Sequence, residues 1–372
     1  MAMEMYPKMT VLGMMSGTSM DGIDCIIAQI QMSNQYELSF KIIETYTQPI
    51  PNDLRNEIKP FIENPNLDYK SLDKKIGHFY SQSASQLSQT SQLDLISIHG
   101  QTIYHKERIK SIQIGDPKFI YEKFKTTVVY NFRKNDILVN GTGAPLMPFL
   151  DWLFLKDSNF FDITLNIGGI SNITAISKCG HKNEVIGFDT GPGMSLIDEC
   201  CMHYFNVLYD KDAHYSKDGK LIPEMLNELM QLPFIKMDYP KSTGRDMFGK
   251  KLALKFIDKY YFESPENILR TFIAFTAKSI SENLNKIRNF RPSDARLFIS
   301  GGGINHPIII EDLKKYSQIK FIENSNSLNI DPDYKEALLM SVLGYTNINH
   351  IPNNMPSVTG ANKDVILGEI YK

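Results

Sequence analysis

The chain has 372 residues, of which 42% are hydrophobic and 22% charged, a composition typical of a globular protein with about two domains. Its formal net charge is -2 and the two signs are interspersed, so nucleic acid and anionic membranes are not expected as partners. The N-terminal residues lack a signal-peptide pattern, the most apolar stretch (145–155) is too short to cross a bilayer, and four cysteines form no C-x-x-C pair. These features favour a reduced, cytoplasmic protein without a disulfide framework.

Short apolar strands alternate with helical patterns along the chain, which predicts an α/β fold. The predicted strands are 11–15, 25–31, 93–98, 128–132, 163–167, 185–188 and 296–300. Apolar residues at helical spacing predict helices over 72–87, 269–288 and 334–343. Many of the strands end in polar residues or glycine, at the position where open α/β sheets place ligands. The composition shift nearest to a domain boundary is the Gly/Pro-rich stretch 140–148.

The turn between the first two strands, within Gly13–Asp24, is the candidate phosphate site. Neither a P-loop nor a strand followed by G-x-G-x-x-G occurs, so a nucleotide needs another cradle. Gly17 and Gly22 allow close approach of the backbone to a ligand, and turn amides can hydrogen-bond phosphate oxygens. Hydroxyl groups that can do the same are those of Ser16, Thr18 and Ser19.

Two carboxylates, Asp21 and Asp24, belong to the same stretch. They would repel a bare polyphosphate, and they make sense if one of them holds Mg²⁺, directly or through water. The alternative is a solvent-exposed hairpin turn, which needs only two or three of these residue types.

Two further glycine-rich turns follow apolar strands, at Asn166–Thr174 and Ser300–Asn305. Three consecutive glycines in the second turn permit a flat ligand face against the backbone, as an adenine or a ribose requires. With the first turn they favour a nucleotide bound between two lobes, and the repeated pattern suggests two related halves.

Asp189 stands at the end of an apolar strand, in the segment 187–193 whose glycines and proline fix the following turn. A carboxylate presented in this way can act as a general base toward a hydroxyl or a water, typically worth about 10²–10⁴ in rate. The alternative is a cap for the helix that begins near Met194, a role open to Asp189 or Thr190.

Two more polar residues have two interpretations each. His99 follows a strand and could hydrogen-bond a sugar or be a satisfied core histidine, and neither it nor His105 has partners at zinc-site spacing. Glu336 lies in a helical pattern, where a solvated surface role is the ordinary expectation.

Taken together, these motifs resemble the anhydro-N-acetylmuramic acid kinase family, a branch of the actin/hexokinase/sugar-kinase superfamily. The resemblance spans residues 11–361 and follows the order of the family's motifs. The similar runs are GMMSGTSMDGID, HGQTIYH, IQIGDP, NFRKND, GTGAPLMP, LNIGGISNIT, GFDTGPG, PKSTGRD, SGGGINHP, YKEALLMSVLG and PSVTGA.

The resemblance implies a two-lobed, actin-like ATPase fold of RNase H-like topology with a central nucleotide cleft. It places residues 1–132 and about 346–372 in the first lobe and 133–345 in the second, and it implies ATP, Mg²⁺ and a homodimer. Residues expected at the ATP phosphates are Gly17, Thr18, Ser19, Met20, Asp21, Gly22, Ile23 and Asp24. Residues expected at the rest of the nucleotide are Gly168, Gly169, Gly301, Gly302, Gly303 and Asn305.

The resemblance also implies a reaction in which Asp189 activates a water that attacks the anomeric carbon of 1,6-anhydro-N-acetylmuramic acid. The freed 6-oxygen then attacks the γ-phosphate, giving N-acetylmuramic acid 6-phosphate and ADP in peptidoglycan recycling. Such a phosphoryl transfer asks mainly for positioning and charge neutralisation. Residues expected on the sugar side are His99, Gln101, Thr102, Arg133, Asp136 and Glu336.

The chain departs from the family pattern next to the expected sugar pocket. Met194 stands where the family usually has Asn, Cys200 stands near a Trp position, and 140–143 read NGTG instead of GGQG. Three other functions stay open: a kinase for another amino sugar, a non-catalytic nucleotide-gated sensor, and an anhydrosugar hydrolase that needs no ATP. The intact GFDTGPG motif and the glycine-rich turns favour the kinase.

Overall fold

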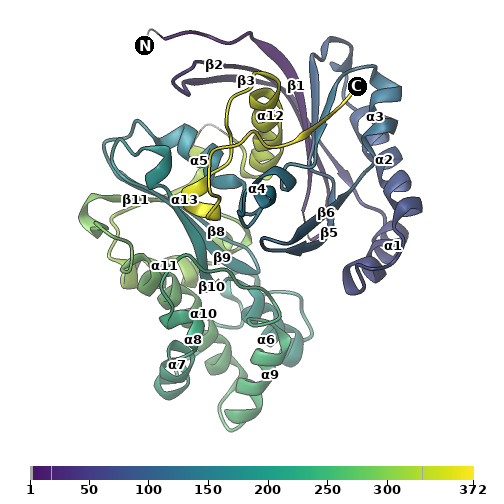
Figure 1. The fold of residues 1–372 in the computed structure, drawn as a ribbon. Helices are drawn as coiled ribbons and strands as arrows, with labels where there is room; N and C mark the ends of the chain where they lie inside the picture. Colours follow the sequence, from purple (N-terminus) through teal and green to yellow (C-terminus); the bar gives the residue numbers. More distant parts are fainter. Residues whose placement is uncertain (1–2, 18, 329) are drawn as a thin grey trace. The chain divides into compact units, whose positions relative to one another are not determined.

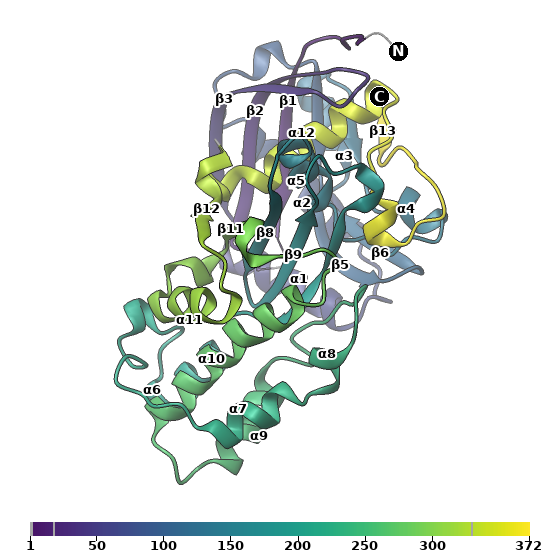
Figure 2. The same ribbon diagram turned by 90° about the vertical axis from the view of Figure 1, so that its left-hand side faces the viewer.

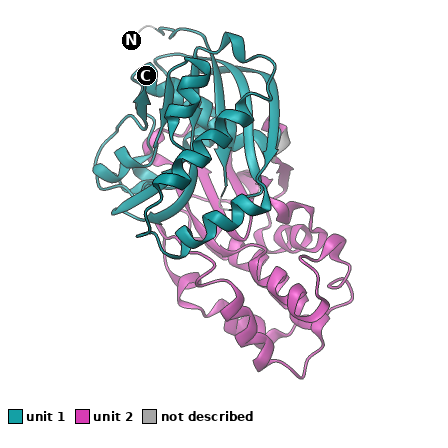
Figure 3. Ribbon diagram, turned by 90° about the vertical axis from the view of Figure 1, so that its right-hand side faces the viewer, with its two compact units in different colours: residues 1–154, 330–372 teal, residues 155–329 magenta. Residues whose placement is uncertain are grey.

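The computed structural model describes residues 3–17, 19–328 and 330–372 (Figure 1 and, turned by 90°, Figure 2). Helices and strands alternate along the chain, which confirms the predicted α/β class. The chain divides into two compact units, coloured separately in Figure 3.

Unit 1 comprises Met1–Phe154 and Ile330–Lys372. Its strands are β1 (Met9–Ser16), β2 (Gly22–Met32), β3 (Leu38–Pro49), β4 (Leu95–Ile98), β5 (Gln101–Lys106), β6 (Lys110–Ile114), β7 (Val128–Tyr130) and β13 (Glu369–Tyr371). Its helices are α1 (Asn52–Glu63), α2 (Lys70–Ala84), α3 (Pro117–Phe124), α4 (Lys134–Leu138), α5 (Met147–Leu155), α12 (Lys335–Ile348) and α13 (Pro356–Thr359).

Unit 2 comprises Leu155–Asn329. Its strands are β8 (Phe161–Ile167), β9 (Ile170–Ile176), β10 (Ile186–Pro192), β11 (Ala295–Ser300) and β12 (Phe321–Asn324). Its helices are α6 (Ser195–Phe205), α7 (Pro223–Met230), α8 (Pro233–Lys236), α9 (Lys250–Lys259), α10 (Pro265–Leu284) and α11 (Pro307–Ser317), with a short 3-10 helix, η5 (Gly302–Asn305), before α11.

The main sheets of the two units have the same strand order. In unit 1 the order is β3-β2-β1-β4-β7, with β13 added beyond β7, and in unit 2 it is β10-β9-β8-β11-β12. In both sheets the first three strands are antiparallel and the next two run parallel to the central strand. This is the RNase H-like topology that the resemblance implies, and it confirms the prediction of two related halves.

The predicted helices and strands form with shifted ends. The helix predicted over 269–288 is α10, which starts at Pro265 because the Ser264 hydroxyl accepts a hydrogen bond from the amide of Asn267. Proline is favoured at the first helical position, since its missing N–H would have had no partner within the helix.

The division into units differs from the predicted one at both ends. Residues 133–154 and 330–345 belong to unit 1, although the sequence placed them in the second lobe. The physical reason is that α12 packs on β1, β2 and β4. An added Cβ at Gly13 of β1 would lie 2.1 Å from the carbonyl oxygen of Ala337, so only glycine allows the helix to approach this closely. Both Figure 1 and Figure 2 show α12 beside β1 and β2.

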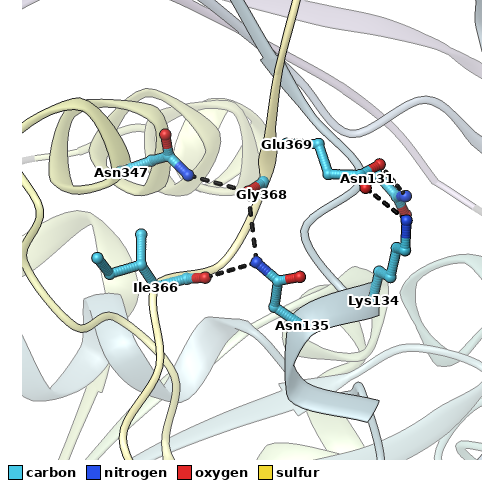
Figure 4. Close-up of polar contacts among 7 residues, drawn as sticks. All are labelled: Asn131, Lys134, Asn135, Asn347, Ile366, Gly368 and Glu369. Carbon is cyan, nitrogen blue, oxygen red and sulfur yellow. Dashed lines mark hydrogen bonds and ion pairs between the residues drawn. The ribbon is translucent and has the colours of Figure 1, made fainter. Parts of the chain in front are cut away.

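The C-terminal segment is fastened to unit 1 by amide side chains and an ion pair (Figure 4). Strand β13 pairs antiparallel with β7. The Nδ2 of Asn135 donates to the carbonyl oxygen of Ile366 at 2.8 Å, and that of Asn347 to the carbonyl oxygen of Gly368 at 3.0 Å. Lys134 and Asn131 both contact the carboxylate of Glu369.

Each unit has its own apolar core. In unit 1 the core lies between the sheet and the helices α1, α2 and α3, and in unit 2 it surrounds the long helix α10. In the part of the chain that the structure describes, no helix combines the length and the apolar character that crossing a bilayer requires.

Candidate active site

The turn between β1 and β2 forms the candidate phosphate site in unit 1. Thr18, which the sequence places in it, lies outside the described residues. The amide of Met20 donates to the carbonyl oxygen of Gly17 at 3.2 Å, and Met20 has a left-handed backbone with φ of 58°. Below the turn, the buried hydroxyl of Ser16 lies 2.7 Å from the hydroxyl of Tyr80 in α2. The turn is therefore tight and anchored from its base.

The surroundings of the two glycines of this turn, at positions 17 and 22, differ. An added Cβ at Gly17 would make only ordinary contact, 3.5 Å from Oγ of Ser19, so packing does not require a glycine there. At Gly22 the added Cβ would lie 3.0 Å from the carbonyl oxygen of Gln48 and 3.0 Å from Cγ2 of Thr47. Strand β3 thus accounts for the glycine at position 22, and Ile23 beside it is buried in the core.

Gln101 and Thr102 begin β5, next to the turn. Gln101 is 1% exposed, and its Nε2 donates to the carbonyl oxygen of Gly17 at 3.2 Å. Its Oε1 is buried and has no hydrogen-bond partner among the described residues. The hydroxyl of Thr102 accepts from Nε2 of Gln113 at 3.2 Å. Gln101 therefore supports the backbone of the phosphate turn, whereas the sequence placed it on the sugar side.

Carboxylates gather beside the turn. Asp21 is exposed, whereas Asp24 is partly buried and accepts from the hydroxyl of Thr47 at 2.7 Å. Burial raises the pKa of Asp24, the Thr47 hydrogen bond opposes this, and the charges of Asp333 and Asp21 raise the pKa further. A cation would relieve this repulsion.

These residues fit Mg²⁺. Mg²⁺ is commonly held by one or two carboxylates together with water and substrate phosphates, rather than by an all-protein cage. Among the described residues, no group of three or more His, Cys, Asp or Glu side chains is placed to hold a metal ion. Asp21 and Asp24 are the residues that would hold the ion, and the ion would neutralise charge on the phosphates.

His99 is buried and orients Arg133. The Nε of Arg133 donates to Nε2 of His99 at 3.2 Å, and Nδ1 of His99 donates to the carbonyl oxygen of Gly100 at 2.9 Å. Burial, together with the charge of Arg133, lowers the pKa of His99 to about 3, so the ring is neutral at physiological pH. Arg133 also donates through Nη1 to the carbonyl oxygen of Gly143 at 2.9 Å.

Glu336 is the second residue of helix α12 and is coupled to Arg133. Burial lowers the pKa of Arg133 to about 10, and the charge of Glu336 opposes this shift. Residue 336 as a whole is exposed, but its carboxyl group is surrounded by protein atoms, and this desolvation raises its pKa while the charge of Arg133 opposes the shift. The neighbouring Lys335 forms a buried ion pair with Asp151 of α5, with 7% and 2% of the two side chains exposed. This pair fixes the start of α12, and with it Glu336.

Asp136 has a different place from the one predicted. It is 1% exposed, and its Oδ1 accepts from Nδ2 of Asn354 at 3.1 Å and from the hydroxyl of Thr359 at 2.9 Å. Its Oδ2 accepts from the amide of Gly143 at 2.8 Å and leaves no room for a Cβ at Gly141, which would lie 2.1 Å away. Three hydrogen bonds within the protein assign Asp136 to holding the 141–143 loop and the C-terminal segment together. The glycines at 141 and 143 serve the same loop.

In unit 2, Asp189 lies at a bulge in β10. Its Oδ2 accepts from the amide of Thr243 at 2.8 Å and from the hydroxyl of Ser242 at 3.1 Å, and its amide donates to the carbonyl oxygen of Lys241 at 3.1 Å. Helix α6 has Met194 as its N-cap, without a side-chain cap. The helix-cap alternative for Asp189 is therefore wrong.

Polar residues of α10 support the backbone after Asp189. The Nδ2 of Asn283 donates to the carbonyl oxygen of Thr190 at 3.0 Å, and the hydroxyl of Thr276 donates to that of Gly193 at 2.8 Å. The sequence predicted this helix from its apolar residues alone. The missed signal was a set of polar residues at helical spacing in an otherwise apolar helix, Thr276, Ser279 and Asn283.

The 168–169 turn is occupied by contacts with the start of α6. The carbonyl oxygen of Gly168 accepts from the amide of Met194 at 2.7 Å, and that of Gly169 accepts from the amides of Gly193 and Ser195. The guanidinium of the exposed Arg245 lies over Gly169, 2.9 Å from the position of an added Cβ. The chain's PKSTGRD run, to which no role was given, thus borders both Asp189 and this turn.

In the third turn, only one of the three glycines faces open space. Gly301 and Gly303 pack against the end of β8, where an added Cβ would lie 2.4 Å from Oδ1 of Asn166 and 2.3 Å from Cγ2 of Ile167. At Gly302 an added Cβ would meet nothing within 4 Å. Gly302 and the exposed Asn305 are therefore the residues of this turn available to a nucleotide.

One departure from the family pattern lies in the apolar core of unit 2. Cys200 is fully buried among the apolar side chains of unit 2, so its exchange for a Trp alters core packing.

Two RNase H-like units with glycine-lined turns and a strand-end carboxylate define the class of the actin-like ATPases and sugar kinases. Comparison with known proteins narrows this class. The model of the family "Anhydro-N-acetylmuramic acid kinase" matches residues 9–372, so the chain belongs to the anhydro-N-acetylmuramic acid kinase family.

Relatives of the same name are similar over nearly their full length. A protein of Bacillus cereus (strain AH820) is 38% identical, over 97% of this chain and 99% of its own. One of Bacillus anthracis (strain A0248) is 37% identical with the same coverage. Solved structures are much more distant. The activator of 2-hydroxyisocaproyl-CoA dehydratase from Clostridium difficile, with bound ADPNP, gives a TM-score of 0.43 at 10% identity over 92% of this chain and 96% of that one. So remote a likeness says nothing about the site.

Proposed function

We propose that this chain is an ATP-dependent kinase that converts 1,6-anhydro-N-acetylmuramic acid and water to N-acetylmuramic acid 6-phosphate, in peptidoglycan recycling and amino sugar catabolism. The observation that carries the proposal is the carboxylate of Asp189, held at the bulge of β10 by the amide of Thr243 and the hydroxyl of Ser242. It occurs in a chain that matches the kinase family over residues 9–372.

In the proposed reaction, Asp189 takes one proton from a water while the water oxygen bonds to the anomeric carbon. The bond from that carbon to the 6-oxygen breaks, and the 6-oxygen attacks the γ-phosphorus of ATP. The bond from the γ-phosphorus to the bridging oxygen breaks, ADP leaves, and Asp189 returns its proton to solvent. Because one side chain starts both events, ring opening and phosphoryl transfer are coupled.

The remaining residues bind and orient the substrates. Turn amides and hydroxyls within Gly17–Asp24 are proposed to bind the phosphates, and Gly302 with Asn305 the nucleoside. Arg133 has N–H groups beyond those accepted by His99 and Gly143, and we assign these to the sugar together with Glu336 and Thr102. Mg²⁺ bound at Asp21 and Asp24 would reduce the negative charge on the phosphates.

We also propose that the enzyme acts in the cytoplasm as a homodimer. All four cysteines are free thiols in the structure, as expected in a reducing compartment. The dimer follows from the family resemblance, and light scattering of the purified protein tests it, since a mass near 42.5 kDa would identify a monomer.

The decisive experiment follows 1,6-anhydro-N-acetylmuramic acid by mass spectrometry, with and without Mg-ATP. The expected product is the 6-phosphate, formed only with ATP. Ring opening without ATP would identify a hydrolase, turnover of a different amino sugar alone would identify another kinase, and nucleotide binding without turnover would identify a sensor.

The base is tested with Asp189→Asn, and Asp246→Asn is the matched control because Asp246 is an exposed carboxylate in the loop whose Ser242 and Thr243 hold Asp189. Asp189→Asn is expected to bind ATP but to lose both ring opening and phosphate transfer by about 10²–10⁴-fold. Asp246→Asn should keep both. Full phosphorylation by Asp189→Asn would remove this carboxylate from the mechanism.

A further inference from the structure

Lys241 is a buried lysine that lies outside the reaction just described. It is 7% exposed, and its Nζ donates to the carbonyl oxygens of Phe234 and Met237, both at 2.8 Å. These carbonyls lie in and directly after α8, a helix of a single turn. The same Nζ lies 4.7 Å from the centre of the Phe234 ring. The side chain therefore ties the 237–249 loop to α8.

The backbone around Lys241 holds Asp189. The carbonyl oxygen of Lys241 accepts from the amide of Asp189 at 3.1 Å, and the next two residues, Ser242 and Thr243, are the donors to Oδ2 of Asp189. Three consecutive residues thus contact the carboxylate residue on one side, while the first of them is fastened to α8 on the other. A displacement of Lys241 toward or away from α8 would therefore also displace Ser242 and Thr243, and with them the carboxylate of Asp189.

Burying the ammonium group of Lys241 at this position costs free energy. A buried ammonium loses hydration, and Lys286 brings a second ammonium to the same place, because its Nζ donates to the carbonyl oxygens of Ile235 and Met237 at 2.7 Å. Burial, and then the charge of Lys286, lower the pKa of Lys241 to about 8. An apolar side chain would fill this space without the cost, but it could not bind two carbonyls and so fix the loop.

We infer that Lys241 is a positioning residue for Asp189: its clamp on α8 sets the placement of Ser242 and Thr243, and through them the direction of the carboxylate. The inference rests on the proposed function, in which Asp189 is the base. Loss of the clamp should slow the chemical step and leave ATP binding unchanged, because Lys241 forms no hydrogen bond with the described residues of the glycine-rich turns.

Lys241→Met tests the clamp, and Lys286→Met is its matched control. Both variants remove an ammonium from the same carbonyl of Met237, but only Lys241 belongs to the loop that contacts Asp189. We expect Lys241→Met to lower kcat by about 10–100-fold with the KM for ATP within about twofold of wild type, since small misplacements of catalytic groups have effects of this size. Lys286→Met should lower Tm while kcat stays within about threefold of wild type. Equal losses of kcat in both variants, or an unchanged kcat in Lys241→Met, would overturn the inference.

Hydrogen exchange at the amides of Asp189 and Thr243 gives a readout that needs no activity. It should be faster in Lys241→Met than in wild type and unchanged in Lys286→Met, and equal rates in all three proteins contradict the clamp. A wild-type protein without kinase activity would refute the proposed function, while the exchange rates would still decide whether Lys241 fixes the loop. Should Lys241→Met not fold, Lys241→Gln, which keeps a donor and loses the charge, decides by the same two measurements.

Discussion

Alanine substitutions at three neighbouring glycines, 301 to 303, should have three different outcomes. Gly301 has φ of 82° and ψ of 170°, a backbone region essentially restricted to glycine, which costs other residues about 1–3 kcal/mol. Its added Cβ would also lie 2.4 Å from Oδ1 of Asn166, and that of Gly303 would lie 2.3 Å from Cγ2 of Ile167. Overpacking of this kind costs about 1–3 kcal/mol. Gly301→Ala should therefore lose about 2–6 kcal/mol of unfolding free energy, the sum of the two effects, and Gly303→Ala about 1–3 kcal/mol from overpacking alone. Gly302→Ala should change it by less than about 0.5 kcal/mol, because its Cβ would meet nothing within 4 Å.

Thermal unfolding and steady-state kinetics check these three values. For a domain of this size, each kcal/mol lowers Tm by about 2–4 °C, so Gly303→Ala should melt about 2–12 °C below wild type. Gly302→Ala should keep its Tm but raise the KM for ATP about tenfold, because the methyl group occupies the surface proposed for the nucleoside, at a cost of about 1.4 kcal/mol. An unchanged KM in Gly302→Ala refutes the placement of the nucleotide on this turn. Wild-type stability of Gly301→Ala and Gly303→Ala refutes the steric reasoning itself.

Three further predictions concern unit 1. His99, buried beside Arg133, has a pKa lowered from 6.5 to about 3, so the stability it contributes is complete above pH 6.5 and is lost as the pH falls toward 3. In urea unfolding, the free energy of unfolding of His99→Gln should therefore fall less between pH 6.5 and pH 4 than that of wild type. Equal decreases in the two proteins would speak against a neutral His99. Lys335→Met leaves the buried Asp151 carboxylate without its cation and should lower the free energy of unfolding by about 3–5 kcal/mol, most of which the double variant with Asp151→Leu should recover. Asp136→Asn should cost about 1–3 kcal/mol of stability and change the KM for the sugar less than Arg133→Met does; the opposite order of KM values would return Asp136 to the sugar site.

Local pattern was sufficient for much of the fold. The Gly-rich hairpin of β1 and β2, the helix α2 and the strand β8 were all predicted, because side-chain periodicity within one segment decides which face is buried. Strand β3 was not predicted. It lies at the edge of the sheet, and its partly buried residues alternate with exposed ones such as Ser39 and Lys41, so it has no continuous apolar run.

Contacts between distant segments were beyond the reach of local pattern. The sequence placed Asp136 at the sugar, but two of the partners of its carboxylate, Asn354 and Thr359, lie 218 and 223 residues away. In the same way, Gly22 was read as a ligand-facing glycine, whereas strand β3 packs against it. The residues that orient Asp189 come from a loop more than fifty positions later in the chain. The local sequence therefore predicted the carboxylate but not the residues that orient it.

The packing of α12 on β1, β2 and β4 has a consequence for biosynthesis. Unit 2 is one uninterrupted segment, Leu155–Asn329, while unit 1 needs both α12 and β13 from the end of the chain. A nascent polypeptide can therefore complete unit 2 while the sheet of unit 1, made first, still lacks a covering helix and an edge strand. On the ribosome, protease resistance should accordingly appear in the later-made half before the earlier one.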